Sequence, residues 1–463
     1  MRLSDRLSRI AALKPPRVHW PSSPAPHRTG HGFAPEIPEG ASRLADLLEA
    51  APRRNRFGEH LALRKWFSID RGGSEAPGRE LAAAAWPLLA PHACESATDP
   101  QRWLFLDTET TGLSGGTGTY PFLVGIAWWE ADGLEVEQLF LREPSEEHSL
   151  LAALTERMAE RPVLVTFNGK SFDWPLLETR YRMTRAIEPP LADAHLDFLH
   201  PARNLWRLRL GSVRLAELER YVLGWNRGAD IISEMIPQIY FDYLRGGPPD
   251  SLVSVFQHNQ MDLLGLARLA TRVLNLLAHP EIHGQDALEL FGASRICERR
   301  GHAARARTLY QRSIAGQLPP ATDRAARRSL ARLAKRDGDL PMAYEIWEGM
   351  LGHSPEGFEA YEQLAIYYER RARDPEQALR LTRQALSELS RANRLDTISP
   401  AARRSLRLRF ETRAARLESR ISRTPLTVSG TPLTGEGALH AEVRLPARKD
   451  SRSVKRRRLQ QLL

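Results

Sequence analysis

The sequence predicts an α/β domain, a mixed sheet flanked by helices, followed by an all-α repeat domain, with N- and C-terminal segments that are largely irregular. Between about residues 101 and 280, apolar β-rich runs give way to alternating strand and helix patterns. From 288 to about 420 every pattern has helical periodicity. The segment 1–100 is rich in Pro and Arg, with short helical candidates such as "ASRLADLLEA", and we expect no independent core there. The segment 421–463 ends in a basic run that is typical of a flexible tail.

Length, charge and cysteine content narrow the class of protein. A chain of 463 residues exceeds one ordinary core, so we expect two or three domains. No apolar run approaches the roughly 20 residues that span a bilayer, and the N-terminus lacks a secretory signal, so we expect a cytoplasmic protein without a membrane anchor. Cys94 and Cys297 are far apart, which disfavours a disulfide framework or a zinc site. The net charge of +10 suits a polyanionic partner, although ribosomal or membrane-surface contacts and a merely basic soluble chain fit it too.

The α/β region begins with three apolar strands, and strands then alternate with helices. The predicted strands are 103–108, 121–129, 134–141 and 163–167, the last running into an Asn-Gly turn. The predicted helices are 146–160, 174–183, 212–224 and 255–274. This order predicts a sheet covered by helices.

The helical region contains an approximate internal repeat. A Gly, Ala, large-aromatic pattern in "GHAARARTLYQRSI" returns in "GDLPMAYEIWEGML", and "DPEQALRLTRQAL" keeps the alanines in step. Ala306, Ala343 and Ala378 are 37 and 35 residues apart, close to the 34-residue period of tetratricopeptide repeats. The alternative is a helical bundle whose alanines coincide. We favour tetratricopeptide-like repeats over 288–420 that bind a protein partner or guide a substrate.

Two acids end the first strand of the α/β domain. In "FLDTET" the alternation of a strand places Asp107 and Glu109 on one face. Two uncompensated carboxylates at the end of a buried strand repel each other and lose hydration, so they need a counter-charge such as a bound cation. Taken alone, the pair fits exposed strand-end acids equally well.

Further acids in the same domain favour the metal site. Asp173 follows the strand and turn of "VLVTFNGKSFD" at the start of a helix, and His258 and Asp262 lie four residues apart on one face of a later helix. The ordered set of Asp107, Glu109, Asp173 and Asp262 matches the oxygen ligands that two hard cations require, and we expect Mg²⁺ or Mn²⁺. His258, one turn from a metal ligand, is placed to act on a water proton.

These motifs resemble those of a known superfamily. "DTETTGL", "NGKSFD" and "HNQMD" look like the three motifs of the DEDD exonucleases, which have a ribonuclease H-like fold. The NxxxFD and HxxxD spacings are similar to those of the proofreading exonuclease domains of family B polymerases, where a tyrosine usually stands in place of His258. About 180 residues, including "LHPARNLWRLRLGSVRLAELERYVLG", resemble the YprB-type bacterial ribonuclease H-like domain, which is often joined to tetratricopeptide-like helices.

The resemblance implies a 3′-5′ exonuclease that uses two Mg²⁺ or Mn²⁺ ions on the 3′ end of DNA or RNA. In such sites one Asp bridges both metals, and Asp107 matches that position. Glu109 and Asp262 would complete the first metal site and Asp173 would support the second, while His258 would orient or deprotonate the attacking water. The roles of the substrate-binding residues follow from the same resemblance.

Four residues are implied in substrate binding. Thr110, Thr111 and Leu113 would contact the terminal nucleotide, with Leu113 wedging a base. Asn168 would contact substrate or, alternatively, only order its turn. The competing hypothesis for the whole chain is a helical-repeat scaffold whose nuclease-like module mainly binds nucleic-acid ends, and the sequence does not choose between DNA and RNA.

Other polar groups in the domain are predicted to be structural. Asp197 follows a strand and could enter the second layer around the site, and Tyr240 and Tyr243 are predicted to pack. Caps, turns or surface positions are expected for all four of the further acids, Asp193, Asp197, Asp230 and Asp242.

Overall fold

A single mixed sheet forms the centre of the α/β domain. The computed structural model describes residues 39–68, 77–90, 95–112, 118–228, 230–352, 354–395 and 398–423. Within them, seven strands pair in the order β1-β2-β5-β4-β3-β6-β7. Their bounds are β1 Ala51–Asn55, β2 Gly58–Ser68, β3 Trp103–Thr110, β4 Pro121–Glu130, β5 Gly133–Phe140, β6 Val163–Thr166 and β7 Ala194–Asp197. The neighbouring strands β1, β2, β5, β4 and β3 pair in an antiparallel manner, whereas β3, β6 and β7 run parallel.

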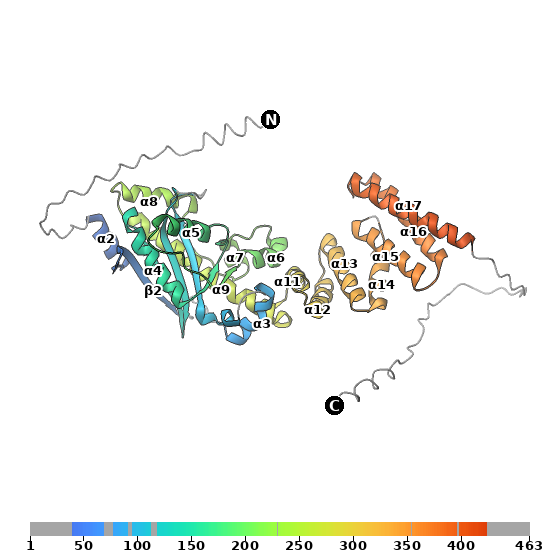
Figure 1. Cartoon of the computed structure of the whole chain (residues 1–463), viewed down its shortest axis with the longest axis horizontal. Coiled ribbons are helices and arrows are strands. Elements are labelled where there is room, and N and C mark those ends of the chain that lie inside the picture. Colours follow the sequence, from blue (N-terminus) through green and yellow to red (C-terminus); the bar gives the residue numbers. More distant parts are fainter. Residues whose placement is uncertain are drawn as a thin grey trace, which may run out of the picture. The chain divides into compact units, whose positions relative to one another are not determined.

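Successive residues of β3 enter two different cores. Trp103 and Phe105 belong to one buried cluster, and Leu104 and Leu106 to the other. This period of two requires that both faces of the sheet are covered, as the near-continuous apolar run of β3 predicts. Figure 1 shows helices on both sides of the strands.

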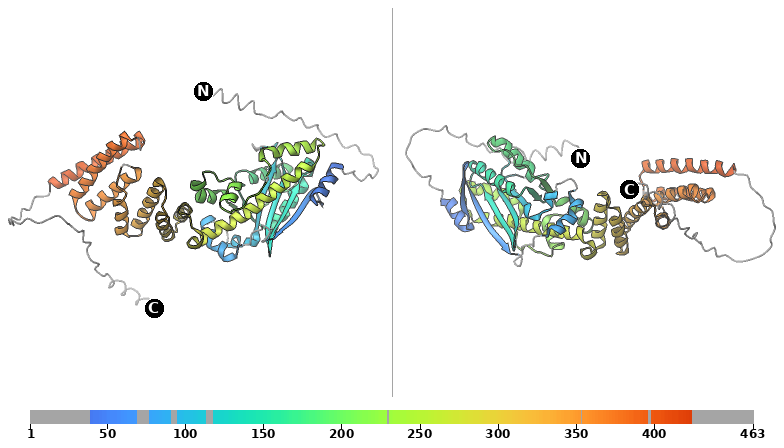
Figure 2. Two further views of the ribbon diagram at one scale, coloured as in Figure 1. Left: turned by 180° about the vertical axis from the view of Figure 1, so that it is seen from behind. Right: turned by 60° about the horizontal axis from the view of Figure 1, so that its bottom comes forward.

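The two faces have different helices. The cluster around Leu104 includes residues of α2 (Glu39–Leu48), α4 (Glu147–Glu160), α5 (Asp173–Thr184) and α8 (Ile236–Leu244). The cluster around Trp103 includes residues of α3 (Arg79–Leu89), α6 (Leu199–Leu210), α7 (Leu215–Tyr221) and most of the long helix α9 (Asp250–Ala278). Helix α9 contacts β3, β4 and β5 and runs along the sheet (Figure 2). Short 3₁₀ turns lie at η2 Glu95–Thr98, η3 Pro100–Arg102, η4 Pro144–Glu146 and η5 Ser233–Met235.

The expectation that residues 1–100 are mostly irregular needs correction for the part that the structure describes. Residues 51–68 form β1 and β2, and β2 pairs with β5 from Leu61↔Phe140 to Ser68↔Gly133. Helices α2 and α3 add to the two cores. Most of β1 is exposed and β2 buries only a short central run, so neither strand shows the alternation that marks a strand in a sequence. Residues 1–38 lie outside the described part.

Helices continue to Ser422. They are α10 Pro280–His283, α11 Ala287–Arg299, α12 Ala303–Ala315, α13 Pro320–Arg336, α14 Leu340–Glu348, α15 Pro355–Arg370, α16 Pro375–Arg394 and α17 Pro400–Ser422. Asp339, Ser354, Asp374 and Ser399 cap the starts of α14 to α17, each with Pro in the first turn. This pairing of cap and proline is a strong local start signal for a helix.

The chain divides into two compact units between Met350 and Leu351. This division does not coincide with the boundary expected between 280 and 288, because α11 to α13 contribute to the same core as Trp103. The alanines of the proposed repeat, Ala306, Ala343 and Ala378, are fully buried, and the aromatic Tyr310 and Trp347 are buried too. Their assignment to tetratricopeptide-like repeats stays a prediction. None of the described helices is long and apolar enough to cross a bilayer.

Candidate metal and catalytic site

The last residues of β3 carry the first two acids. Asp107 and Glu109 alternate with Thr108 and lie on the sheet face that holds Trp103 and Phe105, so they point towards α9. The pairing register with β4 shifts between Glu109 and Thr110. The sequence therefore predicted correctly that the two carboxylates share a face.

Helix α9 approaches Asp107 very closely. Asn259 Nδ2 donates to Asp107 Oδ2 at 2.8 Å, and Gln138 Nε2 donates to Asn259 Oδ1 at 2.8 Å. Gly125 of β4 makes room for this contact, because a Cβ at that position would lie 2.1 Å from Asn259 Oδ1. A strand glycine often marks such a close approach.

His258 and Asp262 lie on the same face of α9, as their spacing predicts. His258 Nε2 lies 3.5 Å from Asp262 Oδ2 and 3.9 Å from Glu109 Oε1. The other ring nitrogen, Nδ1, lies 2.8 Å from Asp230 Oδ1. A carboxylate at Nδ1 favours the tautomer that carries its proton there, which leaves the Nε2 lone pair facing Glu109 and Asp262.

Asp173 is the first residue of α5 and reaches the same group of acids. The Thr108 hydroxyl donates to Asp173 Oδ1 at 2.5 Å. The position at a helix N-terminus places backbone N–H groups near the carboxylate. The structure thus brings together all four predicted acids and His258 from β3, α5 and α9.

Burial raises the pKa of three of the four acids, whereas the fourth, Asp262, pairs with Arg227. Burial, followed by repulsion from Asp262, Asp173 and Glu109, raises the pKa of Asp107 well above its usual range. Burial and the charges of Asp262 and Asp173 also raise the pKa of Glu109 well above its usual range. Burial raises the pKa of Asp173 to about 6, although the Thr108 hydrogen bond opposes the shift. Cations bound among these carboxylates would remove the repulsion.

The donor set fits a divalent cation. Ligand atoms of Glu109, His258 and Asp262 all lie within 4.8 Å of one another. Carboxylate oxygens suit Mg²⁺ and Mn²⁺, and an imidazole nitrogen is compatible with Mn²⁺. His258 is therefore close enough to be either a ligand or the group that acts on a water.

Two charged residues around the site were missed by sequence reasoning. Asp230 is exposed and accepts from the Ile231 N–H, as expected of a turn or surface acid, and it also bonds His258. Burial would raise the pKa of Asp230, but the hydrogen bond with His258 and the charges of His258 and Arg227 outweigh it and lower that pKa. Arg227 Nη2 donates to Asp262 Oδ1 at 2.5 Å and pairs with Asp230 at 3.2 Å. No linear spacing relates these loop residues to the motif on α9, so a sequence pattern could not identify them.

Arg227 is itself held by a buried acid. Its guanidinium also pairs with Glu219 of α7, whose side chain is 0% exposed. Burial raises the pKa of Glu219 to about 7, although the hydrogen bond from Arg227 opposes the shift. The Glu219 carboxylate lies over Gly265 of α9, where a Cβ would meet Glu219 Oε1 at 1.7 Å. The packing of Glu219 against Gly265 therefore affects the position of Asp262, because Arg227 contacts both carboxylates.

Three of the four predicted substrate residues, Asn168, Thr110 and Thr111, form hydrogen bonds within the domain. Asn168 has a left-handed φ of 71°, and its N–H donates to Asp197 Oδ1 at 2.8 Å, so it orders the turn that precedes Asp173. The Thr110 hydroxyl donates to the Gly112 carbonyl, and Thr111 Oγ1 accepts from the Tyr120 N–H. Leu113 lies outside the described residues. Asp197 also accepts from the N–H groups of Lys170 and Leu199, so it is a turn and cap residue as predicted.

Contacts with neighbouring side chains account for Tyr240, Asp193 and Asp242. Tyr240 stacks on Phe122 with ring centroids 4.0 Å apart. Asp193 pairs with Arg102, and Asp242 pairs with Arg245.

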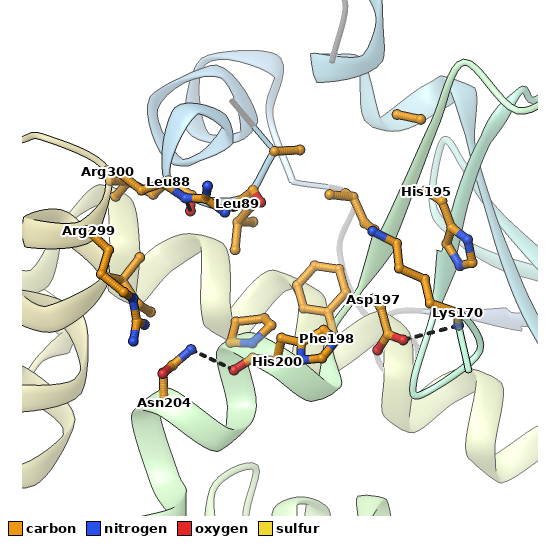
Figure 3. A pocket seen from close by; sticks show the side chains of 15 residues that line it. Leu88, Leu89, Lys170, His195, Asp197, Phe198, His200, Asn204, Arg299 and Arg300 are labelled. Carbon is orange, nitrogen blue, oxygen red and sulfur yellow. Dashed lines mark hydrogen bonds between the residues drawn. The ribbon is translucent and has the colours of Figure 1, made fainter. Parts of the chain in front are cut away.

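Two cavities lie on neighbouring faces of α6. One of about 540 Å³ contains Asp107 and Asp262 together with Asn168 and the arginines Arg203, Arg207 and Arg214. The other, of about 570 Å³, contains none of the four acids (Figure 3). In Figure 3 Lys170 and Asp197 lie on one side of it, and Arg299 and Arg300 on the other. Two of the four predicted acids, Asp107 and Asp262, therefore line the first cavity.

Comparisons with known proteins identify the type of domain that carries these residues. The family model RNase_H_2 of the RNase_H superfamily matches residues 104–274, which include Asp107, Glu109, Asp173 and Asp262. Over 287 residues the chain is 31% identical to YprB of Bacillus subtilis (strain 168), an uncharacterised protein, covering 61% of this chain and 69% of YprB.

A solved structure with a weaker likeness is the family B DNA polymerase of the hyperthermophilic archaeon Pyrobaculum calidifontis. It is 15% identical, with a TM-score of 0.33, and the match covers 45% of this chain and 28% of the polymerase. A likeness at this level says nothing of function.

Proposed function

The chain belongs to the YprB family and contains an RNase_H superfamily domain, and on this basis we propose that it is a metal-dependent 3′-5′ exonuclease of the DEDD type. Its substrate would be the phosphodiester bonds at single-stranded or frayed ends of DNA or RNA. The observation that carries the proposal is the convergence of Asp107, Glu109, Asp173 and Asp262, whose mutual repulsion and burial call for cations.

The four carboxylates would hold two Mg²⁺ or Mn²⁺ ions. When bound, such ions stabilise the charge on the entering and leaving oxygens of a displacement at phosphorus. The protein supplies fixed positions for the ligands. Asn259 holds Asp107, Thr108 holds Asp173, and Arg227 holds Asp262.

His258 would accept the proton of the attacking water at Nε2. Asp230 fixes the ring orientation from the Nδ1 side, and Ser233 Oγ lies 3.5 Å from Nε2. The ring is largely buried, which limits the positions that it can adopt. A base held in this way needs no reorganisation when the water arrives.

The direct test replaces Asp107 by Asn, which is nearly the same size and retains a group that can bond Asn259. We expect wild type to release nucleotides from end-labelled single-stranded DNA or RNA with Mn²⁺ or Mg²⁺. We expect Asp107→Asn to lose about 10³-fold or more of that rate, because one charged ligand of the site is gone. Asp242→Asn, a surface acid on α8, serves as the matched control and should keep the wild-type rate.

A second measurement tests the metal without activity. Mn²⁺ at about 100 times its dissociation constant should stabilise wild type by about 2.7 kcal/mol in thermal unfolding, and Asp107→Asn should gain much less. Wild type that neither releases nucleotides nor gains stability from Mn²⁺ would contradict the proposal. It would favour the alternative of a helical-repeat scaffold that only binds nucleic-acid ends.

A further inference from the structure

The cavity that contains the acids also has a cationic wall. Arg203 and Arg207 come from α6 and are four residues apart, so they lie on one face of that helix. Arg214 follows after Gly211, whose φ of 75° turns the chain at the end of α6. Three guanidinium groups from a short segment thus border the same space as Asp107 and Asp262.

These three arginines have exposed side chains and no carboxylate partner. No described residue forms an ion pair with Arg203, Arg207 or Arg214. Other arginines nearby are paired: Arg209, on the same helix, bonds Glu289, and Arg227 bonds Glu219 and Asp262. Structural needs therefore do not explain the three unpaired charges. A cationic wall without internal partners beside a cavity suits an anionic ligand.

We propose that Arg203, Arg207 and Arg214 bind successive phosphates of the single strand whose end enters the carboxylate site. The inference rests on the proposed function, because the same cavity would hold the reacting end. Guanidinium groups bind phosphate oxygens in a bidentate manner and carry no base information, so the contact is independent of sequence. The cavity volume of about 540 Å³ is in the range of small-ligand pockets, which is enough to hold a nucleotide.

The neighbouring cavity is less suited to bind the nucleic-acid strand. Its Arg300 already donates to the backbone carbonyls of Leu88 and Leu89, at the end of α3. Its remaining cations, Lys170 and Arg299, lie on opposite sides of the space (Figure 3). The phosphate contacts are therefore assigned to the wall formed by α6.

Binding is the primary test, since it does not require hydrolysis. Fluorescein-labelled single strands of DNA and of RNA, 12 nucleotides long, are titrated with wild type and with Arg203→Gln, Arg207→Gln and Arg214→Gln, in Ca²⁺ and at several salt concentrations. We expect each change to weaken binding about fivefold or more, equally for DNA and RNA, and to lower the salt slope by roughly one. The matched control Arg245→Gln removes one exposed charge just after the end of α8, outside this cavity, and should bind as wild type does.

A second measurement identifies where the effect acts. With cleavable labelled strands, we expect the three variants to raise KM more than they lower kcat. Circular dichroism and thermal unfolding should show wild-type folding, because all three side chains are exposed. Arg207→Lys should recover part of the affinity, since it restores the charge but not the bidentate geometry.

The outcomes separate this inference from the function on which it rests. Hydrolysis of thymidine 5′-(p-nitrophenyl phosphate) by wild type reports the carboxylate chemistry without a strand, and its absence together with inert strands counts against the proposed function. Unchanged strand affinity in all three variants and in their combination overturns the inference, whether or not wild type is active. Weakened binding of thymidine monophosphate with unchanged strand affinity overturns it too, because the wall would then serve a mononucleotide.

Discussion

At the scale of single residues, the two nitrogens of His258 have different surroundings. Nδ1 meets Asp230, and Nε2 meets Glu109 and Asp262. This arrangement separates the atom that orients the ring from the atom that can exchange a proton or bind a cation. The same residue type elsewhere in the domain has a structural role, as His60 shows.

His60 makes the stability of the fold sensitive to acid. It is 1% exposed, its Nδ1 lies 2.8 Å from Ser149 Oγ, and burial lowers its pKa to about 4. The folded pKa is below the unfolded value of 6.5, so the stabilising contribution is complete above pH 6.5 and is lost as the pH falls towards 4. We expect about 2 kcal/mol of this contribution to be lost between pH 7.5 and 5.

Urea unfolding at both pH values measures this effect against His60→Gln, which does not titrate and can keep a bond to Ser149. The free energy of unfolding of wild type relative to the variant should be about 2 kcal/mol lower at pH 5 than at pH 7.5. An identical difference at the two pH values would show that His60 is not the titrating group.

Single residues also show how far the sequence could predict the site. Strand periodicity places Asp107 and Glu109 on one face, and helix periodicity does the same for His258 and Asp262. The sequence order of the acids and the resemblance to the DEDD motifs predicted that Asp173 joins these two pairs. Asp230, Arg227 and the arginines of α6 reach the site through loops and helix docking, which have no period. Their side-chain types carry no distinguishing pattern in a chain with 66 Lys and Arg residues.

At the scale of elements, the position of α9 on the sheet decides the geometry of the site. The helix supplies His258, Asn259 and Asp262, and its closest approach to the sheet is at Gly125. We expect Gly125→Ala to displace Asn259 and with it Asp107, destabilising the fold by about 1–3 kcal/mol. Thermal unfolding and nucleotide release measure the two effects.

The matched control for that variant is Gly118→Ala. A Cβ at Gly118 meets no described residue within 4 Å, so this change should leave stability and activity as in wild type. A Gly125→Ala protein that unfolds at the wild-type temperature would show that α9 adapts without cost, contrary to the packing described here.

Elements differ in how well their sequences predict them. Strand β3 was clear because both of its faces are buried and its run is continuously apolar. Strand β2 was missed because "GEHLALRKWFS" mixes a short buried run with charged residues. Such a strand depends on pairing with β5, a contact between distant parts of the chain.

At the scale of the whole molecule, the α/β domain needs helices beyond its predicted boundary. Glu289 of α11 is buried and accepts from Trp206 Nε1 at 2.7 Å and from Arg272 at 3.0 Å. A chain that ends after Gly284 loses these partners and exposes the core face of α6. The period in the sequence predicts helical repeats, but it does not predict that α11 to α13 pack on the sheet domain.

This leads to a prediction about chain length. We expect a chain that ends after Met350 to fold cooperatively, and one that ends after Gly284 to be destabilised by several kcal/mol or to be insoluble. Circular dichroism melts of both proteins check this. Equal stability of the two would place the boundary near residue 280, as first expected.

Gly265 carries no charge, touches no ligand and would be overlooked in any search for chemical groups. Yet its missing side chain is what allows Glu219 to lie against α9, and Glu219 holds the guanidinium that holds Asp262. Substitutions at residues that do not ionise therefore also affect the site. A single methyl group on an inert position of the helix competes for the same space as the carboxylate on which the alignment of Asp262 depends.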